Sequence, residues 1–224
     1  MTMERTLEPE VMDTAEEADG YDSMNHEEPN RAFVDRLLQL GAGGRVLDIG
    51  CGPGHVAVLL AAQLPQARIV GVDLARHMLE HAERHRAGSP HAERIEFRLA
   101  DAKALEFEDG SFDTVCSNTI LHHIPDPRPF LAEAARVLAP GGVFLVRDLF
   151  RPETPERALE LVAKHAADAD AYQQELFRAS LHAAFTPDEL RRIANESGLE
   201  QAELVLDTDR HMSLQMRRSE ATRE

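Results

Sequence analysis

The chain has 224 residues, and its 40 acidic residues against 24 Lys and Arg give a formal net charge of −16. Because nucleic-acid binding depends on neutralising phosphates with Lys and Arg, this charge argues against a DNA or RNA substrate and against an anionic membrane surface. The length suits one sizeable α/β domain, and the two cysteines, Cys51 and Cys116, are too few for a zinc site, so no metal is expected.

The acidic N-terminus lacks the apolar core of a secretory signal, and no apolar run approaches the length of a membrane span. We therefore expect a cytoplasmic protein. Residues 1–19 are poorly periodic, which predicts a mobile or loosely attached segment. Apolar residues then recur at helical spacing and predict an amphipathic helix over residues 29–40, with Pro29 in its first turn.

The central stretch of the chain is VLDIGCGPG at residues 46–54. Its apolar beginning predicts a buried strand of a parallel sheet, and the Ala- and Leu-rich residues 55–64 predict a helix. Glycines between a strand and a helix N-terminus let a ligand lie close to the backbone. The spacing G-x-G-x-G is one residue shorter than that of dinucleotide sites, and Asp48 precedes it. A carboxylate there would repel a pyrophosphate and attract an ammonium group.

Acidic residues follow the next two predicted strands. Asp73 follows a strand over residues 68–72, and Asp101 follows one over residues 94–99. An acid about 20 residues beyond a glycine loop can accept hydrogen bonds from two ribose hydroxyls. Asp101 could instead cap a turn or a helix.

The segment NTILHHIPD at residues 118–126 follows the fourth strand, at the carboxyl end of the predicted sheet. The elements expected around it are a strand over residues 112–117, a helix over 130–138, a turn over 139–142 and a strand over 143–146 that ends at Arg147-Asp148. Histidine suits proton transfer at neutral pH, so His122 and His123 are candidate bases, and Asp148 could orient one of them. Alternatively, both histidines only pack and form hydrogen bonds within the loop.

The last third of the chain is predicted to be helical and then extended. Residues 157–185 are mostly helical, and Phe177 shares a helical face with Leu181 and Phe185 that is buried or lines a pocket. The capping box at residues 186–189 starts a further helix. Two strands over residues 203–206 and 212–216 come before a polar tail.

In their order and spacing, these motifs resemble those of the class I S-adenosylmethionine (SAM)-dependent methyltransferases. VLDIGCGPG resembles motif I of that family, Asp73 and its continuation resemble motif II, and the helix–Pro–Gly–Gly–strand passage from Arg136 to Val146 is similar to the usual one. The resemblance covers residues 45–148. It implies a Rossmann-like, doubly wound α/β sheet with helices on both faces, mostly parallel, with an antiparallel last strand.

The resemblance also implies an organisation within a single domain. Residues 1–40 would be a tail and a cofactor-covering helix, 41–148 the SAM-binding core, 149–198 a helical segment on the substrate side, and 199–224 the last two strands and tail. Tyr21, Asn25 and His26 could then face cofactor or substrate. The alternative is a surface helix packed on the sheet edge.

The cofactor implied is S-adenosyl-L-methionine, with S-adenosyl-L-homocysteine as product. Asp48 and Asn118 would meet its methionine part, Asp73 the ribose, and Asp101-Ala102 the adenine. Leu74 and Met78 would flank the adenine, although Met78 could equally be ordinary core. The full expected set is Asp48, Gly50, Cys51, Gly52, Gly54, Asp73, Leu74, Met78, Asp101, Ala102 and Asn118.

The acceptor is expected to be a small molecule. The sequence lacks the Asn/Asp-Pro-Pro-Tyr/Phe type of motif that amino-group methyltransferases acting on bases or protein amides carry after the fourth strand. His122 and Asp148 fall on the positions of a catalytic His and Asp in sugar O-methyltransferases. Tyr21, Arg147 and Phe177 are candidate substrate contacts, and Arg147 could instead pair with surface acids. A protein or tRNA acceptor and a non-catalytic SAM-binding module are the alternatives, and the oligomeric state stays open, a homodimer included.

Overall fold

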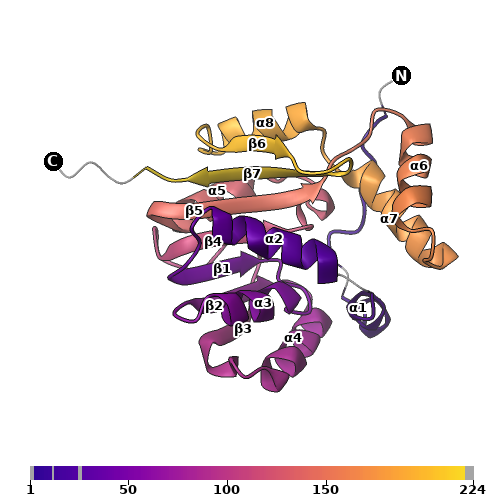
Figure 1. Cartoon of the computed structure of the whole chain (residues 1–224). Helices are drawn as coiled ribbons and strands as arrows, with labels where there is room; N and C mark the ends of the chain where they lie inside the picture. The colour runs from indigo at the N-terminus through magenta and orange to yellow at the C-terminus, as the bar shows by residue number, and fades with distance from the viewer. Residues whose placement is uncertain (1–2, 12, 25–26, 220–224) are drawn as a thin grey trace.

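The structure, a computed structural model, describes residues 3–11, 13–24 and 27–219. Within these ranges a seven-stranded sheet has the order β3-β2-β1-β4-β5-β7-β6 (Figure 1). The strands are β1 (Arg45–Ile49), β2 (Arg68–Asp73), β3 (Ile95–Leu99), β4 (Phe112–Asn118), β5 (Leu138–Leu149), β6 (Glu203–Leu206) and β7 (His211–Arg217). Strands β1 to β5 are parallel, and β7 runs antiparallel to both β5 and β6. The expected mostly parallel sheet with an antiparallel last strand is confirmed.

Helices cover both faces of the sheet, as parallel strands that are apolar on both sides require. One face carries α2 (Glu27–Gln39), α3 (His55–Gln63) and α4 (Arg76–Gly88), and the other carries α5 (Arg128–Val137) and α8 (Pro187–Glu196). On the first face Phe33 and Leu60 are fully buried in one apolar cluster. On the second face Phe130 and Ile193 belong to the other large cluster.

Three further helices lie at the end of the sheet toward which β1 points, on the right of Figure 1. These are α1 (Ala15–Asp22), α6 (Pro155–His165) and α7 (Ala171–Ala183), and the short 3-10 turns η1 (Ala92–Arg94) and η2 (Leu121–His123) complete the helical elements of the described residues. Helices α6 and α7 pack together over Leu149, whereas α1 packs on α4. None of the helices in the described ranges is long and apolar enough to cross a membrane.

The sequence signals at helix ends are confirmed at α8. The Thr186 side chain accepts a hydrogen bond from the Glu189 N–H, the Glu189 carboxylate accepts one from the Thr186 N–H, and Pro187 occupies the first turn. Gly198 follows the helix with φ +79°, a conformation that favours glycine. Local chemistry alone therefore places this helix at the position expected from the sequence.

The turn expected at residues 139–142 lies within β5 rather than before it, because this strand already begins at Leu138. Strand β5 pairs with β4 from Leu138 onward, and the register shifts between Phe112 and Thr114. Gly141, with φ +77°, accommodates this irregularity. A Pro-Gly-Gly run therefore marks a bulge inside a long strand here, and α5 ends at Val137, before the expected Leu138.

The expectation of a loosely attached N-terminus is also wrong for residues 3–11, called the N-terminal segment below. Met3 is buried, and its N–H donates to the Glu153 carbonyl. The Thr6 N–H donates to the carbonyl of His182 on α7. The segment is therefore fixed across the carboxyl end of the sheet, and α1 follows it with its own capping box at Thr14.

Candidate active site

The main cavity lies at the carboxyl ends of the parallel strands, beside the β1–β4 boundary where the strand order reverses. Open α/β sheets bind ligands at such a switch point. The cavity is enclosed by the glycine loop after β1, the ends of β2 and β4, the residues after β3, and α1 with the N-terminal segment. Its lining includes Glu10, Val11, Tyr21, Asn30, Asp48, Gly50, Cys51, Gly52, His55, Asp73, Leu74, Ala75, Met78, Asp101, Ala102, Lys103, Asn118, Thr119, His123 and Ile124.

The glycines of the loop have different roles. Gly52 has φ +51°, and a Cβ added there would meet no atom of the described part of the chain within 4 Å, so the space beside it is open to a ligand. Gly54, which caps α3 with φ +80°, has its missing Cβ 2.6 Å from the Phe97 ring. Gly52 therefore faces the cavity, whereas Gly54 allows α3 to pack against β3.

Asp48 carries a buried oxygen that no described residue satisfies. The residue is only 1% exposed, and its Oδ2 atom has no hydrogen-bond partner among the described residues. Burial, with the charge of Asp73 nearby, raises the pKa of Asp48 to about 7. A buried carboxyl group with an unused acceptor suits a cationic ligand, because an ammonium would supply both charge and hydrogen bonds. The methionine part of SAM fits this requirement.

Asp73 lies at the end of β2, with its carboxylate against the loop. It accepts hydrogen bonds from the Gly52 N–H at 2.7 Å and the Ala75 N–H at 2.8 Å. Burial raises its pKa, although these hydrogen bonds act in the opposite direction. Two of its lone-pair sites remain for ribose hydroxyls.

The remaining residues expected around an adenine ring also lie at the cavity. Leu74 and Met78 line it, and Asp101 accepts a hydrogen bond from the Lys103 backbone N–H at 2.9 Å. Burial would raise the pKa of Asp101, but its hydrogen bonds with Lys103 outweigh this and lower it. Apart from Gly54, the cavity lining contains every residue of the expected cofactor set.

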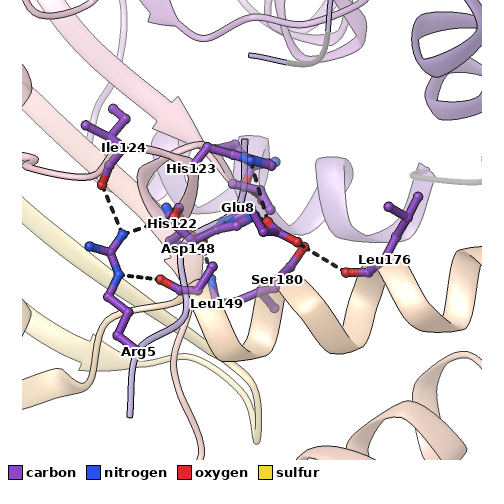
Figure 2. A network of polar contacts seen from close by, with 12 residues as sticks. Arg5, Glu8, His122, His123, Ile124, Asp148, Leu149, Leu176 and Ser180 are labelled. Carbon is purple, nitrogen blue, oxygen red and sulfur yellow. Dashed lines mark hydrogen bonds and ion pairs between the residues drawn. The ribbon is translucent and has the colours of Figure 1, made fainter. Parts of the chain in front are cut away.

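His122 and Asp148 form a buried pair at the end of β5 (Figure 2). His122 Nδ1 lies 2.7 Å from Asp148 Oδ1, and the His122 backbone N–H donates to Asp148 Oδ2 at 3.0 Å. Burial would lower the pKa of His122, but the charge and hydrogen bond of Asp148 outweigh it and raise the pKa. Burial would raise the pKa of Asp148, but its contacts with His122 lower it. The two shifts are those of an oriented imidazole–carboxylate pair.

Comparison with known proteins agrees with this geometry. Residues 40–198 match the family described as "Methyltransferase domain". The chain belongs to this methyltransferase family. It is 32% identical over 182 residues to 27-O-demethylrifamycin SV methyltransferase of Amycolatopsis mediterranei, covering 80% of this chain and 63% of that protein. It is 34% identical over 143 residues to demethylmenaquinone methyltransferase of Symbiobacterium thermophilum, covering 60% of this chain and 57% of that protein.

A solved structure supports the cofactor. Phosphoethanolamine N-methyltransferase 2 of Haemonchus contortus, in complex with S-adenosyl-L-methionine, superposes with a TM-score of 0.67 at 25% identity. The match covers 87% of this chain and 44% of that protein. The chain therefore spans less than two thirds of the length of the relatives named here.

The second histidine of the loop after β4 differs from the first. His123 lines the cavity, and its Nδ1 lies 3.2 Å from the Pro9 carbonyl and 3.5 Å from Glu8 Oε2. Burial and the neighbouring His122 lower its pKa to about 4, so it is neutral at pH 7. The two rings lie 4.2 Å apart between centroids. His122 therefore holds the raised pKa, and His123 forms part of the cavity wall.

The N-terminal segment covers the pair His122 and His123. Figure 2 shows Glu8 between the histidines and Ser180, with its Oε2 3.7 Å from His122 Nε2. The Ser180 hydroxyl donates to Glu8 at 3.3 Å, and burial raises the pKa of Glu8. Arg5 fixes the segment by donating to the carbonyls of Ala183 at 2.6 Å and Ile124 at 3.0 Å. Sequence reasoning missed Arg5 and Glu8, because no period or motif distinguishes them from the other charged residues near them.

Two of the three candidate substrate residues lie away from the cavity. Tyr21 lines the cavity, where burial raises its pKa to about 12. Arg147 neighbours Asp148 on β5 and points to the opposite face of the sheet, where it donates to the Pro29 carbonyl and lies 3.7 Å from Asp207. Phe177 packs with the α6–α7 cluster. Neither Arg147 nor Phe177 is among the described cavity-lining residues; Asn25 and His26 lie outside the described residues.

Proposed function

We propose that this protein transfers a methyl group from SAM to a hydroxyl group of a small molecule, with His122 as the general base. The observation that carries the proposal is the 2.7 Å contact between His122 Nδ1 and Asp148, beside a cavity whose lining fits SAM. Bound SAM supplies a methyl group on a sulfonium, which is already electrophilic. The protein's own part is to align the acceptor, to exclude water and to remove a proton.

The orientation of His122 suits the removal of a proton. Asp148 is held as a carboxylate, so it can only accept, and His122 Nδ1 must carry the hydrogen between them. In the neutral ring His122 Nε2 then has the free lone pair that takes the hydroxyl proton. The imidazolium that results is stabilised by Asp148, as in other His–carboxylate pairs.

The acceptor hydroxyl would take the place of the Glu8 carboxylate at His122 Nε2. The His122 side chain is only 2% exposed, and Glu8 Oε2 is its neighbour on the side away from Asp148. Entry of the acceptor then requires the part of the N-terminal segment around Glu8 to shift. Arg5, which is held by carbonyls of α7 and of the loop after β4, supplies the anchor for that movement.

A small acceptor is favoured by what encloses the cavity and by the charge of the chain. Glu10, Val11 and Tyr21 form a wall over the cofactor side, so a polymer would have to displace two covering elements. The net charge of −16 disfavours a nucleic-acid substrate. The relative from Amycolatopsis mediterranei, named as an O-methyltransferase of a rifamycin, supports an acceptor oxygen.

The test uses SAM with a labelled methyl group and purified enzyme in an extract of the source cells. The label should enter the small-molecule fraction with the wild-type chain. It should be lost with His122→Ala while SAM binding stays unchanged, and His91→Ala, a histidine outside the site, should behave as wild type. Full activity of His122→Ala would contradict the base assignment, and label in protein or RNA would contradict the acceptor class.

A further inference from the structure

A second cluster of histidines lies on the opposite side of the cofactor cavity from His122. It joins Asp22 at the end of α1, His55 at the start of α3 and His85 near the end of α4. His55 Nε2 lies 3.0 Å from Asp22 Oδ1, and His85 Nε2 lies 3.4 Å from the same oxygen. One ligand atom from each residue lies within 4.8 Å of the others. We propose that these three side chains bind a divalent transition-metal ion, with zinc as the ion they suit best, and that this ion fastens α1 over the cofactor cavity.

The two separations between Asp22 Oδ1 and the histidine nitrogens fit a tetrahedral zinc ion. Bonds of about 2.0–2.1 Å to imidazole nitrogen and carboxylate oxygen place neighbouring ligands about 3.3 Å apart at the tetrahedral angle. The separations of 3.0 and 3.4 Å lie on either side of that value. The side chains of His55 and His85 are about one third exposed, at 33% and 32%, so water can supply a fourth ligand.

Two of the three ligands, His85 and Asp22, are held by groups behind them. His85 Nδ1 lies 2.8 Å from the Pro53 carbonyl, and since a carbonyl only accepts, Nδ1 carries the hydrogen. The neutral ring then presents the lone pair of Nε2 to the cluster. Asp22 Oδ2 is held by His81 Nδ1 at 2.9 Å, while Asp22 Oδ1 is buried and receives no hydrogen bond from the described residues. Such outer hydrogen bonds accompany metal-binding histidines and carboxylates.

Protonation of the two histidines would balance the charge of Asp22 less well than a bound metal ion does. The rings of His55 and His85 stack with centroids 4.5 Å apart, so two imidazolium ions there would repel each other. The carboxylates that face the cluster are Asp22 and, through His81, Asp19 at 2.8 Å. A single divalent ion neutralises Asp22 without placing two charged rings in contact.

The site would couple metal binding to the covering of the cofactor cavity. Helix α1 brings Tyr21 to the cavity wall, and His55 lines the same cavity from α3. Ala18 of α1 packs on Ala75 and Met78, beside the expected adenine site. Zinc should therefore slow the opening of α1. Metal binding itself does not depend on the proposed methyl transfer, so the two can fail separately.

The experiment titrates the full-length, metal-stripped protein with Zn²⁺ in a calorimeter and with Co²⁺ by visible absorption. We expect one Zn²⁺ per chain at the cluster and an intense visible Co²⁺ spectrum of tetrahedral type. His85→Ala and Asp22→Asn should each weaken Zn²⁺ binding at least about tenfold. His91→Ala, which removes a histidine on the loop after α4, should leave the affinity unchanged. Asp22→Asn keeps the shape of the side chain and serves if His85→Ala fails to fold.

Amide hydrogen exchange provides a readout independent of affinity. Zn²⁺ should slow exchange in α1 of the wild-type chain and have no such effect in Asp22→Asn. Unchanged Zn²⁺ affinity in both cluster variants would overturn the proposal. So would loss of binding in His123→Ala alone, because the ion would then sit at Glu8, His122 and His123, whose ligand atoms are also mutually close. A wild-type chain that binds no Zn²⁺ would overturn the proposal as well.

Discussion

The His122–Asp148 pair predicts how the rate should depend on pH and how one substitution should change that dependence. The base is active when deprotonated, so kcat/KM should rise with pH through the His122 pKa, which lies above its ordinary value of 6.5. Asp148→Asn removes the charge that raises this pKa. The rising limb should therefore move to lower pH in the variant.

The size of the effect follows from the 2.7 Å contact between His122 Nδ1 and Asp148 Oδ1. General-base catalysis contributes about 10²–10⁴-fold, or about 3–5 kcal/mol, and an Asn in this place can donate to Nδ1 and select the wrong tautomer. We expect Asp148→Asn to lose a factor in this range. The double variant with His122→Ala should be no slower than His122→Ala alone, because the two residues act as a unit.

The assay measures kcat/KM with labelled SAM from about pH 5 to about pH 8, the range in which histidine titrates. Asp207→Asn is the matched control, since Asp207 lies on the other face of β5, near Arg147. It should leave the midpoint of the limb in place. A limb whose midpoint is the same in Asp148→Asn and wild type would refute the assignment of His122 as the base.

The shifted pKa values of His122 and Asp148 also make the free energy of unfolding depend on pH, in opposite directions for the two residues. The raised pKa of His122 gives a contribution that is present below about pH 6.5 and lost as the pH rises through the folded-state pKa. The lowered pKa of Asp148 gives a contribution that is present above about pH 3.9 and lost as the pH falls through its folded-state pKa. The free energy of unfolding of the wild-type chain, measured in urea, should therefore exceed that of Asp148→Asn between about pH 3.9 and about pH 6.5.

Three further predictions concern the cavity and its cover. Because the Asp48 pKa is about 7 without ligand, the affinity for SAM should increase as the pH rises through 7, by up to about tenfold per unit on the acid side, and Asp48→Asn should flatten this dependence in equilibrium binding. Gly52→Val places a branched side chain at φ +51° in open cavity space, so calorimetry should show SAM binding weakened at least about tenfold. A wild-type affinity would mean that the ligand does not approach Gly52. Arg5→Ala removes hydrogen bonds to the carbonyls of Ala183 and Ile124, so the free energy of unfolding measured in urea should fall by about 1–3 kcal/mol. Amide hydrogen exchange should also become faster in residues 3–11, and unchanged exchange would mean that Arg5 does not anchor the segment.

The sheet and the cofactor side of the site could be predicted because their signals are local. The strand before Gly50, the acid at Asp73 and the capping box at Thr186 each consist of a few neighbouring residues whose chemistry requires one backbone arrangement. Parallel strands then bring their carboxyl ends together, so Asp48, Asp73 and Asn118 meet although they are far apart in sequence.

The N-terminal segment that covers the site could not be predicted. Its contacts join residues that are far apart in sequence, and its residues show no helical or strand periodicity. Glu8 reaches Ser180 across 172 positions, and nothing around Glu8 indicates that it faces a histidine. Arg147 illustrates a different limit. It stands one position before Asp148, and the alternation of side chains along β5 places it on the opposite face of the sheet. This placement holds only because the strand continues through both residues.

The fixed N-terminal segment also bears on the order in which the molecule folds. Arg5 bonds to carbonyls that lie 117–178 positions later in the chain, so these partners are synthesised long after Arg5. Contacts of such high sequence separation form late, because the intervening chain must first be ordered. In refolding, the far-UV signal of the sheet should therefore recover before the segment docks. Competence to enclose a ligand would be the last property that the nascent protein acquires.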